Sequence, residues 1–148
     1  MNNGVEEANF DRLSPERRSA LMSKVRGKET KPEVLVRKLL YHRGFRYRKN
    51  VNSLPGKPDI VLAKYRAIVF VHGCFWHQHP GCRKARRPKS RQSYWNEKLD
   101  RNIERDSLKI EQLKKSGWRV FIIWECELKP QCRQQILEAL IEHIVSAE

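Results

Sequence analysis

Apolar residues recur at the three- and four-residue spacing of amphipathic helices in four segments of this chain. Two of these segments open with helix start signals, a Ser-Pro pair at 14–15 and a Thr-x-x-Glu capping box at 30–33. Glycine follows three of them, as is common where helices end. The pattern therefore predicts helices over residues 14–27, 30–44, 93–116 and 136–144.

Four further segments have the pattern of strands. Residues 45–48 alternate apolar and basic side chains, whereas 59–63 and 67–71 form a predicted β-hairpin that is buried on both faces. Residues 120–124 form a fully apolar strand. The order of these elements predicts an α/β fold, a mixed central sheet of about four strands flanked by helices.

The segment 72–92 has no helical or strand periodicity and is rich in His, Cys, Pro, Gly and Arg. A loop of this length inside a compact domain is usually functional. Residues 1–13 are polar and aperiodic, which predicts a flexible N-terminal arm, and the length of the chain favours a single domain over 14–148.

Basic residues outnumber acidic ones, with 31 Lys and Arg against 17 Asp and Glu and a net charge of +14. Such an excess indicates a polyanionic partner, usually nucleic acid. The longest apolar runs, 67–71 and 120–124, are far shorter than the roughly 20 residues of a membrane span. The first residues also lack a signal-peptide pattern, so we expect a cytoplasmic protein with no membrane partner, in which cysteines are metal ligands or inert core thiols.

One carboxylate stands alone in the most basic part of the chain. Residues 34–96 contain fifteen Lys and Arg but a single acid, Asp59. One interpretation is that a basic surface holds a phosphodiester while Asp59 holds the divalent cation that activates it. The alternative is that Asp59 begins a strand and accepts a local backbone N–H.

Two histidines follow the second strand of the predicted hairpin. Because the start of one hairpin strand and the end of the other are adjacent, Asp59 should lie near His72 and His77. An acid with one or two histidines could bind Mg²⁺ and position a water. The two histidines could instead be ordinary loop residues or ligands of a soft metal.

Cysteine and histidine are concentrated at the start of the long loop. Cys74, His79 and Cys82 lie within nine residues, and Cys126 follows the buried strand. A Cys₃His set suits a tetrahedral structural Zn²⁺. Cys132 could replace Cys126, although it also fits a small apolar residue near the start of the last helix.

Aromatic residues flank a basic run in the same loop. Phe75 and Trp76 precede it and Trp95 follows it, so these side chains could stack on bases or open the duplex. The alternative is that they belong to the core. The basic run supplies the residues expected to bind the DNA backbone: Arg83, Lys84, Arg86 and Arg87.

Five motifs together resemble those of the very-short-patch-repair (Vsr) mismatch endonucleases. They are SPERRSALMSKVRGKETKPE, PGKPDIV, FVHGCFWHQHPGC, SYWNEKLDRNIERD and GWRVFIIWECEL, in this order from Ser14 to Leu128. The resemblance implies a type II restriction-endonuclease-like core with a structural zinc loop. It also implies a Mg²⁺-dependent nick in one strand, 5′ to the T of a T:G mismatch left by deamination of 5-methylcytosine.

The resemblance also implies roles for individual residues. Asp59 resembles the metal-binding aspartate and His77 the catalytic histidine, with His72 and Glu33 as further active-site members. Val71 stands where the family binds the metal through a backbone carbonyl. The zinc ligands correspond to Cys74, His79, Cys82 and Cys126, and the aromatic wedge that enters the DNA to Phe75, Trp76 and Trp95.

Our hypothesis is a monomeric, nucleoid-associated nicking enzyme of bacterial type that acts on double-stranded DNA with a T:G mismatch. It would work alongside a cytosine-5 DNA methyltransferase and other repair factors. Two alternatives are a restriction-type nuclease on the same scaffold, which cuts both strands, and a zinc-stabilised DNA-binding module without catalysis.

Overall fold

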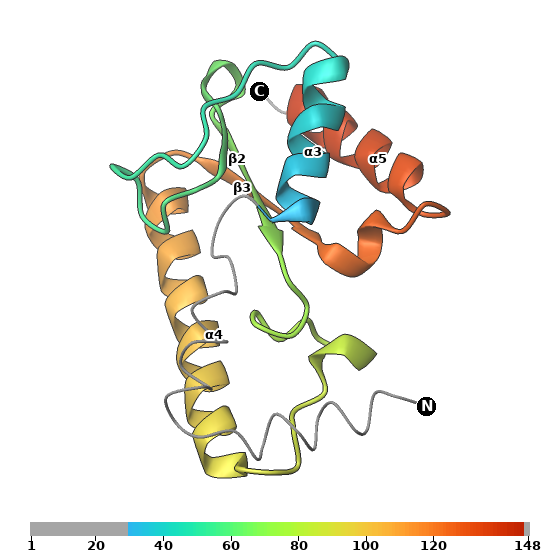
Figure 1. The fold of residues 1–148 in the computed structure, drawn as a ribbon. Helices are drawn as coiled ribbons and strands as arrows, with labels where there is room; N and C mark the ends of the chain where they lie inside the picture. Colours follow the sequence, from blue (N-terminus) through green and yellow to red (C-terminus); the bar gives the residue numbers. More distant parts are fainter. Residues whose placement is uncertain (1–29, 147–148) are drawn as a thin grey trace. The chain divides into compact units, whose positions relative to one another are not determined.

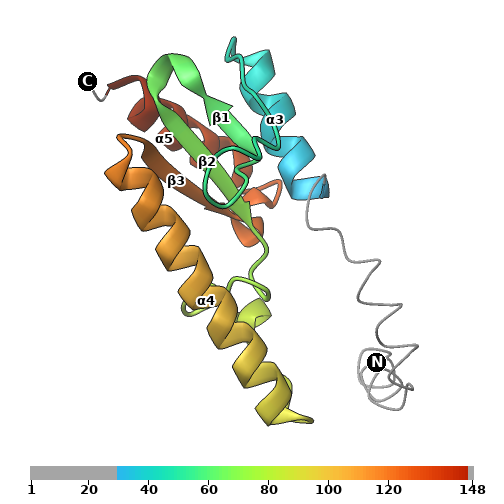
Figure 2. The same ribbon diagram turned by 90° about the vertical axis from the view of Figure 1, so that its left-hand side faces the viewer.

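A parallel pair of strands forms the centre of the fold. In a computed structural model, which describes residues 30–146, β2 (Ala67–His72) pairs parallel with β3 (Arg119–Trp124). On its other side β2 pairs antiparallel with β1 (Ile60–Leu62), so the sheet is mixed and has the order β1-β2-β3. Figure 1 shows β2 beside β3, and Figure 2 shows all three strands. The parallel register ends with His72 beside Trp124.

Both faces of this sheet are buried, because successive residues of each strand face different helices. Along β2, Ala67 and Val69 pack in a core cluster with α3 (Lys31–His42) and α5 (Arg133–Ser146). Ile68, between them, packs with Leu113 of α4 (Gln92–Lys115). Figure 2 shows the result, with α4 in front of the sheet and α5 behind it.

The three helices of this unit confirm the predicted helices at 30–44, 93–116 and 136–144 within a few residues at each end. The predicted helix over 14–27 and the predicted arm over 1–13 lie outside the described residues. Three short 3₁₀ helices complete the fold: η1 (Ala63–Tyr65), η2 (Arg83–Ala85) and η3 (Glu125–Leu128).

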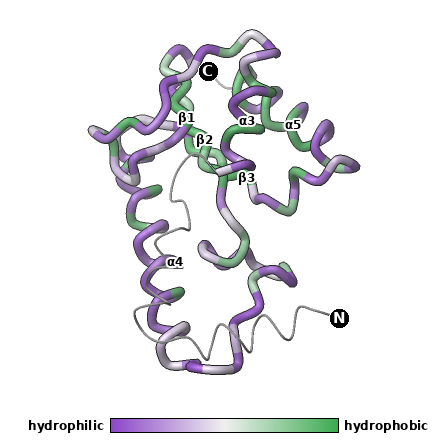
Figure 3. The backbone as a smooth tube through the Cα atoms, viewed as in Figure 1, coloured by the Kyte–Doolittle hydropathy of each residue, from purple (hydrophilic) through white to green (hydrophobic). Residues whose placement is uncertain are grey.

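The helix α4 differs from the others in how little of it is buried. Its buried side chains are Trp95, Leu99 and Leu113, and most of its length is hydrophilic (Figure 3). Residues 30–146 contain no helix with both the length and the apolar character needed to cross a membrane.

The prediction of about four strands is wrong for the described part of the chain, which contains three. The expected strand over 45–48 is reduced to one bridge, in which Arg48 and Val61 exchange two backbone hydrogen bonds of 2.9 Å. The physical reason is that the chain leaves the extended conformation on both sides of this bridge. Asn50 adopts a positive φ of 52°, and the partner strand β1 ends at Leu62, where η1 begins.

Candidate active site and metal centre

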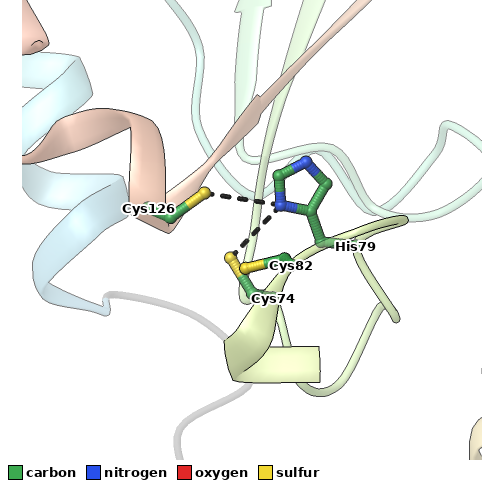
Figure 4. Close-up of side chains that lie close together, drawn as sticks. All are labelled: Cys74, His79, Cys82 and Cys126. Atoms are coloured by element: carbon green, nitrogen blue, oxygen red, sulfur yellow. Dashed lines mark hydrogen bonds between the residues drawn. The ribbon is translucent and has the colours of Figure 1, made fainter. Parts of the chain in front are cut away.

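Four potential metal ligands converge from the long loop and the segment after β3 (Figure 4). One ligand atom each of Cys74, His79, Cys82 and Cys126 lies within 4.8 Å of all the others. The Nδ1 atom of His79 is 3.4 Å from the sulfur of Cys126 and 3.7 Å from that of Cys74. The structure thus assembles the predicted Cys₃His set, with Cys126 rather than Cys132 as its distant member.

The donor atoms fit Zn²⁺ in spacing and in charge. Tetrahedral Zn²⁺, with Zn–S bonds of about 2.3 Å and Zn–N bonds of about 2.0 Å, places sulfur and nitrogen roughly 3.5 Å apart. Burial raises the pKa of the Cys74 thiol to about 12 and also raises that of Cys126. Thiolates packed this closely require a compensating cation, which a divalent metal supplies.

The segment Trp124–Cys126 holds the loop in place before any metal is considered. The indole of Trp124 stacks on the ring of His79, with centroids 4.2 Å apart and planes at 11°. Next to it, a carboxylate oxygen of Glu125 accepts a hydrogen bond of 3.0 Å from the backbone N–H of Cys74. Two ligands are therefore oriented by the residues that precede the fourth, as outer-shell groups orient metal ligands elsewhere.

A second cluster joins the end of β2 to α4. The rings of His72 and His77 stack with centroids 3.9 Å apart and planes at 8°. The Nδ1 atom of His77 lies 2.6 Å from a carboxylate oxygen of Asp106. His72, His77 and Asp106 form the other group of possible metal ligands in the described residues, and an acid–histidine pair of this geometry can also orient an imidazole for proton transfer.

Sequence reasoning did not identify Asp106, although a signal for it exists. Leu99 and Leu113 are buried on α4, and Asp106 lies seven residues from each of them. It therefore shares the helix face of these two leucines and is a carboxylate among apolar positions. Such an interruption indicates a polar partner on the facing element.

His72 is held in its neutral form. Burial lowers its pKa to about 4, and the neighbouring His77 lowers it further than the charge of Asp106 raises it. Within residues 30–146, the buried Nδ1 atom of His72 has no hydrogen-bond partner. A buried imidazole nitrogen of this kind can donate to or accept from a water or a substrate group that enters the site, according to the tautomer.

Asp59 is buried as predicted, but it does not meet the histidines in a metal-sized cluster. Neither group of possible metal ligands in the described residues includes it. One of its oxygens instead accepts a hydrogen bond of 2.5 Å from Arg37 of α3, whose side chain is 4% exposed. Since α3 and α4 cover opposite faces of the sheet, Asp59 and the His77–Asp106 pair are attached to different helices.

The surroundings of Asp59 fit a hard cation only in part. A carboxylate oxygen suits Mg²⁺, but one oxygen of Asp59 already accepts a hydrogen bond from Arg37. Glu33 is buried one helical turn before Arg37 on α3, and Val71 is half-buried on β2. Sequence reasoning did not identify Arg37, a charged residue among the apolar positions of its helix.

The three aromatic residues lie together beside this second cluster. The ring of Phe75 packs edge-on against Trp76 and Trp95, with centroids 5.2 and 5.5 Å apart. Trp95 is buried at 6% exposure, whereas Phe75 and Trp76 are half-buried. Trp95 is therefore a core residue in this conformation, whereas Phe75 and Trp76 are more accessible.

The basic residues predicted to bind the DNA backbone also differ in exposure. Arg83, Lys84 and Arg86 are exposed, but Arg87 is half-buried. Its guanidinium donates hydrogen bonds to side chains of this protein. Only the first three are therefore fully available to an external anion.

Known proteins are similar to this chain over most of its length. The sequence model of a family described as DNA mismatch endonuclease Vsr matches residues 10–84. Type II nicking enzyme V.NmeAIP of Neisseria meningitidis serogroup A is 50% identical over 139 residues, which cover 93% of this chain and 98% of that protein. Type II nicking enzyme V.XorIIP of Xanthomonas oryzae pv. oryzae is 53% identical over 118 residues, 80% of this chain and 86% of that protein. The DNA mismatch endonuclease Vsr of Escherichia coli K12 is 41% identical over 128 residues, 86% of this chain and 80% of that protein.

The Cys₃His cluster predicts one tightly bound Zn²⁺ per chain. Cys126→Ser should lose zinc and folded yield, because structural zinc contributes directly to folding. Cys132→Ser is the matched control and should keep both, since Cys132 lies outside the cluster. Metal analysis of the purified variants measures their zinc content. Zinc retained by Cys126→Ser and lost by Cys132→Ser would reassign the fourth ligand.

Proposed function

This chain belongs to the Vsr family of DNA mismatch endonucleases, and we propose that it nicks one DNA strand 5′ to the T of a T:G mismatch. Such mismatches arise when 5-methylcytosine is deaminated. The observation that carries the proposal is the 2.6 Å contact between His77 and Asp106. The ring of His77 also stacks on that of His72, and His77 directly follows the aromatic pair Phe75–Trp76. A mixed sheet covered by helices on both faces supports a core of the type II restriction-endonuclease kind.

His77 is the residue that we assign to water activation. When its Nδ1–H is donated to Asp106, its Nε2 carries the lone pair that can accept a proton from the attacking water. The carboxylate of Asp106 fixes the ring and stabilises the imidazolium that results. His72, neutral and stacked on His77, limits the rotation of that ring without adding a second charge.

Asp59 and the backbone carbonyl of Val71 are the groups that would hold Mg²⁺, with Glu33 as a further acidic residue. When bound, the ion would neutralise charge on the scissile phosphate and act as a Lewis acid. Arg37 compensates the carboxylate of Asp59 in the buried pair. Removal of either partner would leave an uncompensated buried charge.

Zinc takes no part in the chemistry of this proposal. A site with four protein ligands has no open coordination position, so its role is to fix the loop that carries His77. The same loop exposes Arg83, Lys84 and Arg86 to the DNA backbone. Phe75 and Trp76 would enter the duplex beside the mismatch, opening it as apolar wedges do.

The setting of the reaction follows from this substrate. We propose that a monomer acts on chromosomal DNA in the cytoplasm, at sites where a cytosine-5 methyltransferase has supplied the 5-methylcytosine. Further repair factors would then complete the repair, because a nick alone does not restore the base pair.

Strand mapping tests the proposal directly. End-labelled duplexes that carry T:G, T:A or C:G at one position are incubated with the protein and Mg²⁺ in several flanking contexts. We expect a single nick, 5′ to the T, in the T:G duplex alone. Cleavage of both strands of matched DNA would support the restriction-type alternative, and intact DNA under all conditions would support the non-catalytic one.

Asp59→Asn should abolish Mg²⁺-dependent nicking and keep, or tighten, binding to T:G DNA. The substitution removes the charge that holds the cation and also one negative charge near the DNA backbone. Because Arg37 loses its counter-ion, the melting temperature should fall, and binding is measured below it by titration with labelled duplex. Loss of DNA binding by the folded variant would indicate a structural Asp59, and near wild-type nicking would contradict the mechanism.

His77→Ala and Asp106→Asn should bind T:G DNA and cut it at least about 10²-fold more slowly, the usual contribution of a general base. Glu104→Gln is the matched control, since Glu104 is an exposed acid on the same helix. Single-turnover nicking at saturating Mg²⁺ separates the chemical step from metal occupancy. Equal rates for Asp106→Asn and Glu104→Gln would remove Asp106 from the mechanism.

Phe75→Ala and Trp76→Ala should weaken binding to T:G DNA with little change in melting temperature, since each stacking contact contributes about 1 to 3 kcal/mol. Trp95→Ala should differ, because truncation of a buried aromatic costs about 3 to 5 kcal/mol of stability. Thermal denaturation and duplex titration of the three variants check this. A large fall in melting temperature for the first two would favour the core interpretation for all three.

A further inference from the structure

Arg87 is the centre of a hydrogen-bond network that ties the long loop to α4. Its Nε donates to Oε1 of Gln78 at 3.0 Å. Its two terminal nitrogens donate to Oδ1 of Asn96 at 3.0 Å and to Oδ1 of Asp100 at 2.7 Å. Asn96 and Asp100 are one turn apart on α4, so the planar guanidinium bridges two successive turns of that helix and one loop residue.

Gln78 extends this network to the aromatic pair. It sits in the left-handed backbone region, with φ of 51°. Its Nε2 donates to the carbonyl oxygen of Phe75 at 2.7 Å and to that of Ala85 at 3.1 Å. Both donors and the acceptor of this amide are thus engaged, and one of them holds the backbone of Phe75.

The backbone of Trp76 is held from the same helix. Asn102 of α4 donates from Nδ2 to the carbonyl oxygen of Trp76 at 3.1 Å. The two residues expected to enter DNA therefore have consecutive carbonyl oxygens bound by side chains that are on α4 or are linked to it through Arg87.

We propose that Arg87 and Gln78 are positioning residues, which hold Phe75 and Trp76 in the orientation that opens a T:G pair. This inference rests on the proposed function. Opening a base step costs unstacking energy, and a wedge already fixed in its bound orientation loses less conformational entropy on insertion. The guanidinium of Arg87 serves the protein itself, in contrast to the exposed Arg83, Lys84 and Arg86 that precede it.

The ion pair with Asp100 alone would not carry this role. The side chain of Asp100 is 65% exposed, and exposed pairs contribute little to stability. The role comes from the geometry, since a single half-buried group meets three acceptors at once. Lysine, a point charge on a flexible stem, cannot reproduce this arrangement.

Removal of Asp100 distinguishes a positioning residue from a phosphate contact, because the two roles predict opposite signs. If Arg87 positions the wedge, Asp100→Ala should bind a T:G duplex about three- to tenfold more weakly than the charge-matched Glu97→Ala, and the matched T:A duplex equally well. If Arg87 contacts phosphate, the loss of an acid and the release of its guanidinium should tighten binding to both duplexes. Glu97→Ala is the matched control, an exposed acid of α4 that pairs with Arg101.

The salt dependence of T:G binding gives the second comparison. Arg87→Ala should keep the wild-type slope of binding against salt, whereas Arg83→Ala should lower it by about one, as expected for a lost phosphate contact. Arg87→Lys should behave like Arg87→Ala. A reduced slope for Arg87→Ala, or full recovery in Arg87→Lys, would show that charge alone matters and would overturn the inference.

A third measurement needs no DNA and separates this inference from the proposed function. In the zinc-loaded free protein, hydrogen exchange of the backbone amides of residues 75–79 should be faster in Arg87→Ala, Gln78→Leu and Asp100→Ala than in wild type. Glu97→Ala should match wild type, and zinc content should be equal in all variants. Unchanged exchange in the three variants would overturn the inference even if the wild-type protein nicks T:G DNA as proposed.

Discussion

The parallel pairing of β2 with β3 is the constraint on which both clusters depend. Its register places His72 beside Trp124, at the last pair of the ladder. Both strands then leave the sheet at the same end, so Cys74 and Cys126, each two residues further along, can approach one another. Because strand side chains alternate between faces, a slip of one residue would turn Trp124 away from His79 and His72 together. The metal cluster and the histidine cluster therefore depend on the same ladder of hydrogen bonds.

The two clusters are also in contact through side chains. Trp124 stacks on His79 on one side and meets the edge of His72 on another, with centroids 5.2 Å apart, and His72 stacks on His77. The loop that carries these residues has little apolar core of its own, and Cys74 is its one fully buried side chain among residues 73–91. Metal-binding energy can replace hydrophobic burial as a source of folding energy. A metal held by the Cys₃His cluster would thus be a physical alternative to a larger apolar core in this loop.

The sequence predicted the features that periodicity and spacing encode. The capping box at 30–33, the two-faced hairpin and the amphipathic pattern of 93–116 predicted the elements, and the Cys₃His spacing indicated the metal cluster with Cys126 or Cys132 as its distant member. The partners of buried polar groups were not predicted, since Arg37 and Asp106 come from helices whose facing elements only the fold reveals. The fourth strand was predicted from the alternating pattern at 45–48, which does not show that Asn50 takes a positive φ and that β1 ends where η1 begins, so that only one bridge forms.

The distribution of basic residues changes what the net charge means. Of the fifteen Lys and Arg between residues 34 and 96, Arg37 is buried against Asp59, and Arg87 is bound to Asp100 and two amides. Asp59 is therefore not an isolated acid in a basic field but half of a buried pair, and its attraction for a cation is reduced by the guanidinium beside it. In the proposed mechanism, a divalent ion at that carboxylate would gain the additional negative charge of the phosphate once DNA is bound. Metal and DNA should accordingly bind with positive coupling, each being held more tightly in the presence of the other.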